Sequence, residues 1–356
     1  MKNHSYLNTS GLLNNENLSK DKLIEDRRMS KSDLVIKNPD NMAQTFFTIF
    51  TPIYNRKHTI HRVWESLINQ TNKNFEWILI DNGSEDDVLP LLEEYKSKAD
   101  FPVRIYTQEN KGKYIAFNRV LDLAEGELLF PADSDDTFEP ILIEKMNEIW
   151  AKYKADDVSG ITMLCKDEEG EIVGEKFPFE EGVSTYEEIL YKHKVGGEKW
   201  GCIRVDVLKK YPFPTNFNVK YFPDAYVWDQ IGFNYKTVFV NEPLRTYFQD
   251  AGNQIMKEKN VSEDFMKMKN FYTLWKINFI FPKVTKHLSY SEYYEMYVFL
   301  WISAFKGKIP VLQVIKKLER TKSKIIALFV LIPSFFINIF NLKLNFLRKK
   351  KYKYQI

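Results

Sequence analysis

The sequence predicts an α/β fold with a mainly parallel sheet and crossover helices, followed by a helical C-terminal region. Between residues 46 and 136, short apolar runs alternate with segments of helical spacing roughly every 25 residues. From about residue 262 the chain is aromatic and has helical spacing. Of the 356 residues, 44% are hydrophobic and 15% are aromatic, so the chain can bury a large core and global disorder is excluded.

Each of the first four predicted strands is a short buried run followed by a loop and then a helix. The strands are Phe46–Phe50, Phe75–Ile80, Val103–Thr107 and Glu127–Ala132, and the helices carry apolar residues three and four positions apart, as at Ile60, Val63, Trp64 and Leu67. After about residue 155 the pattern is mixed, with strands predicted at 158–166, 171–177, 200–205 and 237–241 and a helix at 224–235. Strand–helix repeats of this kind place the carboxyl ends of the strands along one edge, where ligands bind.

The charges are divided unevenly along the chain. From Lys306 onward there are 13 basic residues and one acidic residue, Glu319, whereas residues 1–305 hold 38 basic and 47 acidic residues. This distribution predicts an anionic partner for the basic tail, with a membrane surface favoured over nucleic acid. Two cysteines, Cys165 and Cys202, exclude a disulfide scaffold and a cysteine-only zinc cluster. No apolar run follows the first residues, which indicates a cytoplasmic setting without a secretory signal.

The acidic cluster at residues 133–136 directly follows the fourth predicted strand. Its sequence is Asp-Ser-Asp-Asp, and three carboxylates this close repel one another unless a cation lies among them. Oxygen ligands in an open loop suit Mg²⁺ or Mn²⁺, which bridge carboxylates to phosphates. A solvated turn that caps the next helix is the alternative interpretation.

The other strand ends are polar as well. Asp81-Asn82-Gly83-Ser84 could pair with a pyrimidine base, and Tyr54 could stack on it, although an ordinary turn with packed side chains is the alternative. Lys111 and Lys113 flank Gly112 and could neutralise a diphosphate, or belong to a plain basic loop. The glycine patterns of dinucleotide-binding and P-loop proteins are absent, which argues against both classes.

Residues 47–136 resemble the donor-binding half of family 2 glycosyltransferases, which have the GT-A fold. The resemblance rests on four motifs in this order: Thr51-Pro52-Ile53-Tyr54-Asn55-Arg56, Asp81-Asn82-Gly83-Ser84, Asn110-Lys111-Gly112-Lys113 and Asp133-Ser134-Asp135-Asp136. Beyond these motifs it weakens but continues to about residue 250. It implies a nucleotide-diphosphate-sugar donor, most often linked to UDP, and a divalent metal, Mn²⁺ or Mg²⁺, held by Asp133 and Asp135. It also implies that the donor nucleotide contacts Thr51, Tyr54, Asp81, Asn82, Lys111, Lys113, Asp133 and Ser134. Many members have two aspartates where this chain has Asp81-Asn82.

The resemblance also suggests a catalytic base for inverting transfer, which needs a carboxylate to take the proton of the acceptor hydroxyl. In family members an acidic residue opens a helix here and a tryptophan follows four residues later; Asp224 and Trp228 match, while Gln230 replaces the usual arginine. Asp224 is therefore the predicted base, with Asp229 as second candidate. The alternative for Asp224 is a carboxylate that stabilises the helix dipole. Trp200 could line the acceptor pocket or belong to the core.

These features predict three regions. Residues 1–43 form a mobile extension, residues 44–255 form the GT-A catalytic domain with a donor half (44–137) and an acceptor half (138–255), and residues 256–356 form the helical region with the basic tail. Within the tail, Ile325–Phe340 is nearly all apolar but, at about 24 Å as a helix, shorter than the hydrocarbon core of a bilayer. Pro333 is expected to kink it. Its basic flanks favour a segment lying in, or dipping into, the cytoplasmic leaflet, with one spanning helix or a core or oligomer-contact helix as alternatives.

The predicted function is inverting transfer of a sugar from a UDP-sugar to a lipid-linked or glycan acceptor in cell-surface polysaccharide biosynthesis, at the cytoplasmic side of the membrane, with peripheral or monotopic attachment. Two alternatives remain open. One is a nucleotidyltransferase on a related sheet, although the loop at Thr51–Arg56 lacks the glycine-rich sequence of that class. The other is a non-catalytic membrane scaffold that retains the fold.

Overall fold

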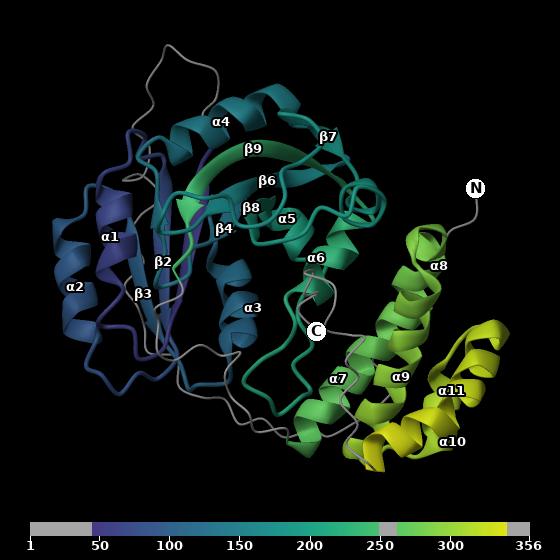
Figure 1. Cartoon of the computed structure of the whole chain (residues 1–356). Coiled ribbons are helices and arrows are strands. Elements are labelled where there is room, and N and C mark those ends of the chain that lie inside the picture. Colours follow the sequence, from purple (N-terminus) through teal and green to yellow (C-terminus); the bar gives the residue numbers. More distant parts are fainter. Residues whose placement is uncertain (1–44, 249–261, 340–356) are drawn as a thin grey trace. The chain divides into compact units, whose positions relative to one another are not determined.

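The computed structural model describes residues 45–248 and 262–339. The predicted extension 1–43 and the predicted boundary between residues 255 and 256 lie outside the described residues. Within the described ranges, nine strands form one sheet in the order β3-β2-β1-β4-β8-β6-β9-β5, and β7 pairs with β9 beside this path (Figure 1). The strands are β1 (Phe47–Ile53), β2 (Phe75–Asp81), β3 (Val103–Thr107), β4 (Leu128–Pro131), β5 (Thr137–Phe138), β6 (Val158–Lys166), β7 (Glu181–Ser184), β8 (Lys199–Arg204) and β9 (Lys236–Thr246).

The first half of the sheet is parallel, as predicted. Strand β1 runs parallel to both β2 and β4, and β2 runs parallel to β3. The crossover helices are α1 (His61–Ile68), α2 (Leu89–Lys98) and α3 (Lys113–Leu123), and α4 (Leu142–Tyr153) leads into the second half. There β8 is antiparallel to β4 and β6, whereas β6 and β9 are parallel.

The sheet is covered on both faces, which explains why its strands are apolar at successive positions. In β1, Ile49 belongs to the core beneath α1, α2 and α4, whereas its neighbour Phe50 belongs to the core beneath α3. The second core also receives residues of α5 (Val205–Leu208), α6 (Ala225–Gly232) and α7 (Glu263–Trp275).

The prediction of a strand at 171–177 was wrong. Only Ile172 forms an isolated bridge, to Lys166, and the side chain of Phe177 instead packs in a small apolar cluster against Phe239. The next strand along the chain after β6 is β7, which pairs with β9. Strand β9 extends five residues beyond the predicted end at Asn241.

The C-terminal region is helical, as predicted. After α7 a π-helical turn (Lys276–Ile280) leads to α8 (Phe281–Val284) and a 3₁₀ turn (Thr285–His287), followed by α9 (Tyr290–Lys306), α10 (Val311–Lys317) and α11 (Thr321–Ile339). Helix α7 packs on the catalytic domain through ring contacts of Phe271 with Phe217 and of Trp275 with Tyr226, whose centroids are 5.2 and 4.8 Å apart. Helix α11 continues through Pro333, so this residue does not end it. In the described part of the chain, α11 is the one helix long and apolar enough to cross a membrane, judged by length and composition alone.

Candidate functional site

The carboxyl ends of β1, β2 and β4 meet at one edge of the sheet, which brings the predicted motifs together. Ile53 at the end of β1 is in register with Asp81 at the end of β2, and the amide of Asn82 donates to the carbonyl of Ile53. The amide of Ala132 donates to the carbonyl of Phe50, so the loop at Asp133–Asp136 begins beside the same edge. The sheet register therefore builds the site.

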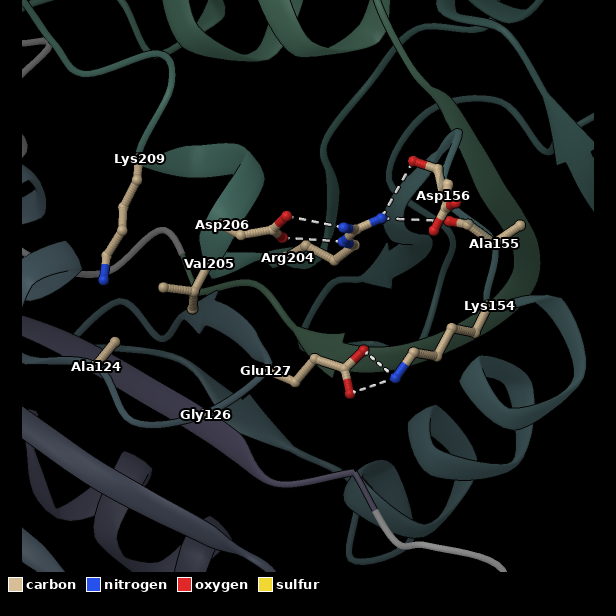
Figure 2. Close-up of a pocket in the computed structure, with 10 residues that line it drawn as sticks. All are labelled: Ala124, Gly126, Glu127, Lys154, Ala155, Asp156, Arg204, Val205, Asp206 and Lys209. Carbon is tan, nitrogen blue, oxygen red and sulfur yellow. Dashed lines mark hydrogen bonds and ion pairs between the residues drawn. The ribbon is translucent and has the colours of Figure 1, made fainter.

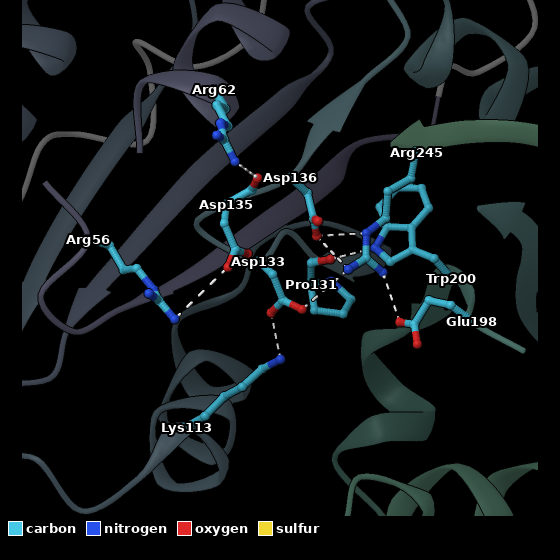
Figure 3. A network of polar contacts seen from close by, with 10 residues as sticks. All are labelled: Arg56, Arg62, Lys113, Pro131, Asp133, Asp135, Asp136, Glu198, Trp200 and Arg245. Carbon is cyan, nitrogen blue, oxygen red and sulfur yellow. Dashed lines mark hydrogen bonds and ion pairs between the residues drawn. The ribbon is translucent and has the colours of Figure 1, made fainter. Parts of the chain in front are cut away.

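The acidic loop is surrounded by cations from three other segments (Figure 3). Lys113, the first residue of α3, donates to Oδ1 of Asp133 at 2.5 Å, and Arg245 of β9 lies 3.4 Å from Oδ2 of the same carboxylate. Burial acts to raise the pKa of Asp133, but Lys113 and Arg245 hold it below its ordinary value. Arg56 lies 4.0 Å from the carboxylate of Asp135.

Arg245 is a residue that the sequence analysis missed. Its buried guanidinium donates through Nε to Oδ2 of Asp136 at 2.7 Å and lies 3.3 Å from Glu198. Because Asp136 is itself buried, this pair fixes the loop that carries Asp133 and Asp135. The sequence of β9 gives no clear signal for Arg245, because the same strand also contains Lys236 and Glu242.

The metal prediction can be tested against the donor set. Burial raises the pKa of Asp135, and the negative charge of Asp133 raises it further, so a cation between them would relieve repulsion. Across residues 45–248 and 262–339, no cluster of three acidic, histidine or cysteine side chains is arranged for a metal. Two carboxylates with the remaining ligands from phosphate and water suit Mg²⁺ or Mn²⁺, so Asp133 and Asp135 fit the implied ion.

Several side chains predicted to contact the donor nucleotide are buried or already hydrogen-bonded within the protein. The Thr51 side chain is fully buried, and its hydroxyl accepts from Nε1 of Trp77 at 2.9 Å, so only the backbone of Thr51 remains to make the predicted donor contact. Asp81 accepts from the amide and hydroxyl of Ser84, and the amide oxygen of Asn82 accepts from Gln108 at 2.8 Å. Tyr54 is exposed and available for stacking.

The predicted donor contacts of Ser134 and Lys111 stay predictions. Ser134 is buried. The side chain of Lys111 is 63% exposed and pairs with Glu109, whereas Lys113 points at Asp133. The structure therefore separates the two lysines that the sequence treated as a pair.

Gly112 brings the acceptor half to this loop. Its φ of +98° disfavours other residues, and a Cβ atom there would lie 2.3 Å from the carbonyl oxygen of Lys220. Lys220 in turn donates from Nζ to the carbonyl of Asn110 at 2.6 Å. These contacts hold the segment that leads to Asp224 against the donor half.

Asp224 lies at the start of α6, so its two predicted roles, catalytic base and carboxylate that stabilises the helix dipole, both stay predictions. Its side chain makes no capping hydrogen bond, and no described residue donates to its carboxylate. Burial raises the pKa of Asp224, the positive charge of Lys113 opposes this rise, and the negative charges of Asp133 and Glu198 add to it. The carboxylate therefore lies within the electrostatic field of the acidic loop and is free to accept a proton.

The second candidate, Asp229, lies in the interior. Its side chain is about 5% exposed, and burial raises its pKa to about 6, with Lys276 of the helical region opposing the rise. Trp200 is also a core residue, because it packs on Phe130 and Phe138 while its Nε1 donates to the carbonyl of Pro131 at 2.6 Å.

A separate cleft of about 800 Å³ lies beside the segment between α3 and β4, and Figure 2 shows the residues that line it. Gly126 and Glu127 in its wall immediately precede β4, whereas Asp133 follows that strand. In the wall of the cleft Lys154 forms an ion pair with Glu127, and Arg204 forms one with Asp206, so the charges within each pair cancel. The cleft therefore shares no residue with the site described above.

Comparisons with known proteins agree with this geometry. Residues 48–211 match the family model described as Glycosyl transferase family 2. The chain is 24% identical over 159 residues to the "Putative teichuronic acid biosynthesis glycosyltransferase TuaG" of Bacillus subtilis (strain 168), covering 44% of this chain and 60% of that protein. It is 40% identical over 98 residues to the chondroitin synthase of Escherichia coli, covering 27% and 14%.

The fold is also similar to a solved structure. The structure of S. aureus TarS residues 1–349 in complex with UDP-GlcNAc has a TM-score of 0.55 at 19% identity, and the match covers 76% of this chain and 79% of that one. The chain spans 60% of the length of TuaG and 14% of that of the chondroitin synthase, so the matches concern a domain. The fold, the polar side chains at the carboxyl ends of the strands and the family model lead to one conclusion: the chain carries a family 2 glycosyltransferase domain with the GT-A fold.

Proposed function

We propose that this protein transfers a sugar, with inversion, from a UDP-sugar to a lipid-linked or glycan acceptor in the synthesis of a cell-surface polysaccharide. One observation carries the proposal. The carboxylate of Asp224 accepts no hydrogen bond from the described residues and lies in the field of Asp133, whose own carboxylate is held between Lys113 and Arg245. In this proposal Asp224 is the base and the loop at Asp133–Asp136 is the part that faces the diphosphate.

The chemistry follows from these roles. An acceptor hydroxyl attacks the anomeric carbon, the bond from that carbon to the diphosphate oxygen breaks, and Asp224 takes the hydroxyl proton. The raised pKa of Asp224 makes it a better proton acceptor than an ordinary carboxylate. Lys113 is placed to stabilise the leaving diphosphate from the start of α3. A divalent ion, Mn²⁺ or Mg²⁺, at Asp133 and Asp135 would add charge stabilisation of the leaving group.

The choice of UDP is supported by the relatives and by Tyr54. TarS, which shares the fold, has been solved in complex with UDP-GlcNAc. Tyr54 is exposed beside Ser84 and Asp81, because the amide of its neighbour Asn55 donates to the hydroxyl of Ser84. A uracil ring stacked on Tyr54 would lie next to the Asp81 turn.

The acceptor and the location are inferred from names and charge. TuaG is described as acting in teichuronic acid biosynthesis, and the other relative is a chondroitin synthase, so both names refer to polymers of sugars. The basic, apolar C-terminal region suits the cytoplasmic side of a membrane, where a lipid-linked acceptor is found, with peripheral or monotopic attachment. Nucleic acid is not proposed as a partner.

A donor panel tests the proposal. Full-length protein is incubated with individual UDP-sugars and Mn²⁺, with and without EDTA, and release of UDP is measured. We expect metal-dependent release for one donor, lost in Asp133→Asn and strongly reduced in Asp224→Asn. The absence of binding or hydrolysis for every donor would contradict the proposal, and release of pyrophosphate from a nucleoside triphosphate plus a sugar phosphate would favour a nucleotidyltransferase.

A further inference from the structure

Helix α11 exposes apolar side chains on the face that a soluble protein keeps polar. Phe329 is 78% exposed and Ile332 is 66% exposed. They belong to a stripe of large exposed apolar residues, which we call the outer stripe: Ile325, Leu328, Phe329, Ile332 and Ile339. A contiguous exposed apolar surface of this kind marks a contact with a partner or a membrane.

The opposite face of α11 is occupied by the protein itself. Ser323, Ala327, Val330 and Ser334 recur at helical spacing and are buried. Ala327 and Val330 pack in one apolar cluster with Trp301 of α9, and Nε1 of Trp301 donates to the carbonyl of Ala327 at 2.6 Å. Helix α11 is therefore attached along one side to a folded body, while the outer stripe is exposed among the residues that the structure describes.

The charges near the outer stripe identify its partner. Lys316, Lys317 and Arg320 precede α11 and are exposed, and none of them has an ion pair within the described residues. Lys322 and Lys324 lie in the first turn of the helix, and the single acidic residue of this stretch is Glu319. An apolar stripe with a cluster of cations is complementary to a bilayer that contains anionic phospholipids.

The contact with α9 decides how α11 meets the bilayer. If α11 crossed the membrane while packed on α9, it would draw in α7, which is held on the middle of α9 by the hydrogen bond from Asn270 to the carbonyl of Leu300 and carries the charge of Lys269. If it crossed alone, it would have to leave α9 and expose the indole of Trp301, which is buried. Both routes are unfavourable, whereas a helix lying flat needs neither.

We propose that α11 lies in the plane of an anionic membrane, with the outer stripe in the interface and the inner face held on α9. The proposal rests on the membrane-side function above. It selects interfacial attachment over a spanning helix and names the residues that would contact the membrane. It also fixes the catalytic domain to the membrane, because α9 and α7 share contacts such as that between Asn270 Nδ2 and the carbonyl of Leu300 at 2.9 Å.

Binding to vesicles tests the docking face. Full-length protein is sedimented with vesicles of phosphatidylcholine containing 30% phosphatidylglycerol, and with phosphatidylcholine alone. We expect Phe329→Ser/Ile332→Ser to lower partitioning by about 100-fold, since each buried side chain contributes more than about tenfold. Lys316→Gln/Lys317→Gln/Arg320→Gln should weaken binding to the anionic vesicles only. The matched control is Leu89→Ser/Ile141→Ser, which removes two exposed apolar residues from the catalytic domain and should leave partitioning unchanged.

A second measurement distinguishes a flat helix from a spanning one. Both native cysteines are buried and burial raises the pKa of each thiol to about 12, so a fluorophore can be attached selectively at an introduced cysteine. Labels at Lys322→Cys and Ile339→Cys mark the two ends of α11. Protein is added to preformed vesicles, and an impermeant quencher is then added outside. Quenching of both labels supports the proposal, and protection of the label at position 339 overturns it.

Two further outcomes are informative. If wild-type protein does not bind anionic vesicles but dimerises through the outer stripe, so that Phe329→Ser/Ile332→Ser is monomeric, the occupant is a second copy and the proposal is wrong. The donor-release assay runs without vesicles and does not involve α11. Loss of vesicle binding with donor release intact therefore refutes only the membrane face, and vesicle binding without donor release refutes only the enzymatic function.

Discussion

Arg245 and Asp136 form a buried ion pair between residues that are 109 positions apart in the chain. The carboxylate of Asp136 is nearly inaccessible, and one of its oxygens, Oδ1, has no hydrogen-bond partner within the described part of the chain. The same guanidinium reaches Asp133 and Glu198, so it joins β9 to the acidic loop and to the segment before β8. This pair therefore connects the acceptor half of the domain to the loop that carries Asp133 and Asp135 (Figure 3).

Replacing Arg245 by methionine should destabilise the protein and impair donor binding. Asp136 would remain buried without its counterion, which typically costs about 3–5 kcal/mol. The double variant Arg245→Met/Asp136→Leu removes both charges and should recover most of the stability, while donor affinity stays low because Asp133 has lost one of its two cations. Denaturant titration and UDP binding measure the two effects. A double variant with wild-type donor affinity would show that Arg245 has no positioning role.

The parallel half of the fold could be predicted because its strands are buried on both faces. The four strand predictions agree with β1 to β4 to within three residues at each end, since apolar runs and turn residues mark their limits. Beyond residue 155 this signal fails. Strand β9 contains Pro243 and pairs with β6 through shifts in register, so its period of two is interrupted, and the apolar residues near Phe177 pack without pairing.

The site could be predicted only where its residues are neighbours in sequence. The acidic loop, Lys113 and Asp224 stand in local motifs, but Arg245 owes its place to the pairing of distant strands. The burial of Thr51 was missed for a related reason: its orientation depends on Trp77 in the adjacent strand. A motif indicates which residue types are present, whereas sheet register decides which side chains face the ligand.

Two acidic residues of α6 should behave differently when each is replaced by asparagine. Asp224→Asn is expected to lower kcat by about 10²–10⁴-fold, because it removes the proton acceptor. Asp229→Asn should retain most of the activity, because Asp229 is buried beside Lys276. Steady-state rates of UDP release with acceptor measure this difference, and the opposite result would make Asp229 the base.

Asp229 also makes a specific prediction about stability. Its pKa is raised from 3.8 to about 6 by burial, so the folded protein binds this proton more tightly than the unfolded chain. Stability from this proton is fully present below about pH 4 and is lost as the pH rises through about 6, a change of the order of 3 kcal/mol. Asp229→Asn should remove this component from the pH dependence of the unfolding free energy. An unchanged pH dependence would contradict the burial of an ionisable Asp229.

Lys113 and Lys111 offer a matched pair of substitutions. Burial raises the pKa of Asp224 and Lys113 lowers it, so Lys113→Gln should raise it further and move the acidic limb of kcat/KM to higher pH. Glu198→Gln should move the limb to lower pH, because Glu198 raises the same pKa. Lys111→Gln, at an exposed lysine paired with Glu109, is the control and should leave the limb in place. A limb that does not respond to Lys113 or Glu198 would mean that another group sets it.

Alanine substitutions at Gly112 and Gly170 distinguish the effect of backbone strain from that of a steric clash. Both have positive φ, +98° and +88°, so alanine strains the backbone at either position by about 1–3 kcal/mol. At Gly170 nothing lies within 4 Å of the new Cβ, whereas at Gly112 the Cβ meets the carbonyl oxygen of Lys220 at 2.3 Å. Gly112→Ala must therefore displace the segment before Asp224 and should reduce kcat, while Gly170→Ala should reduce only the melting temperature. Equal losses of kcat in the two variants would mean that the contact with Lys220 does not position the base.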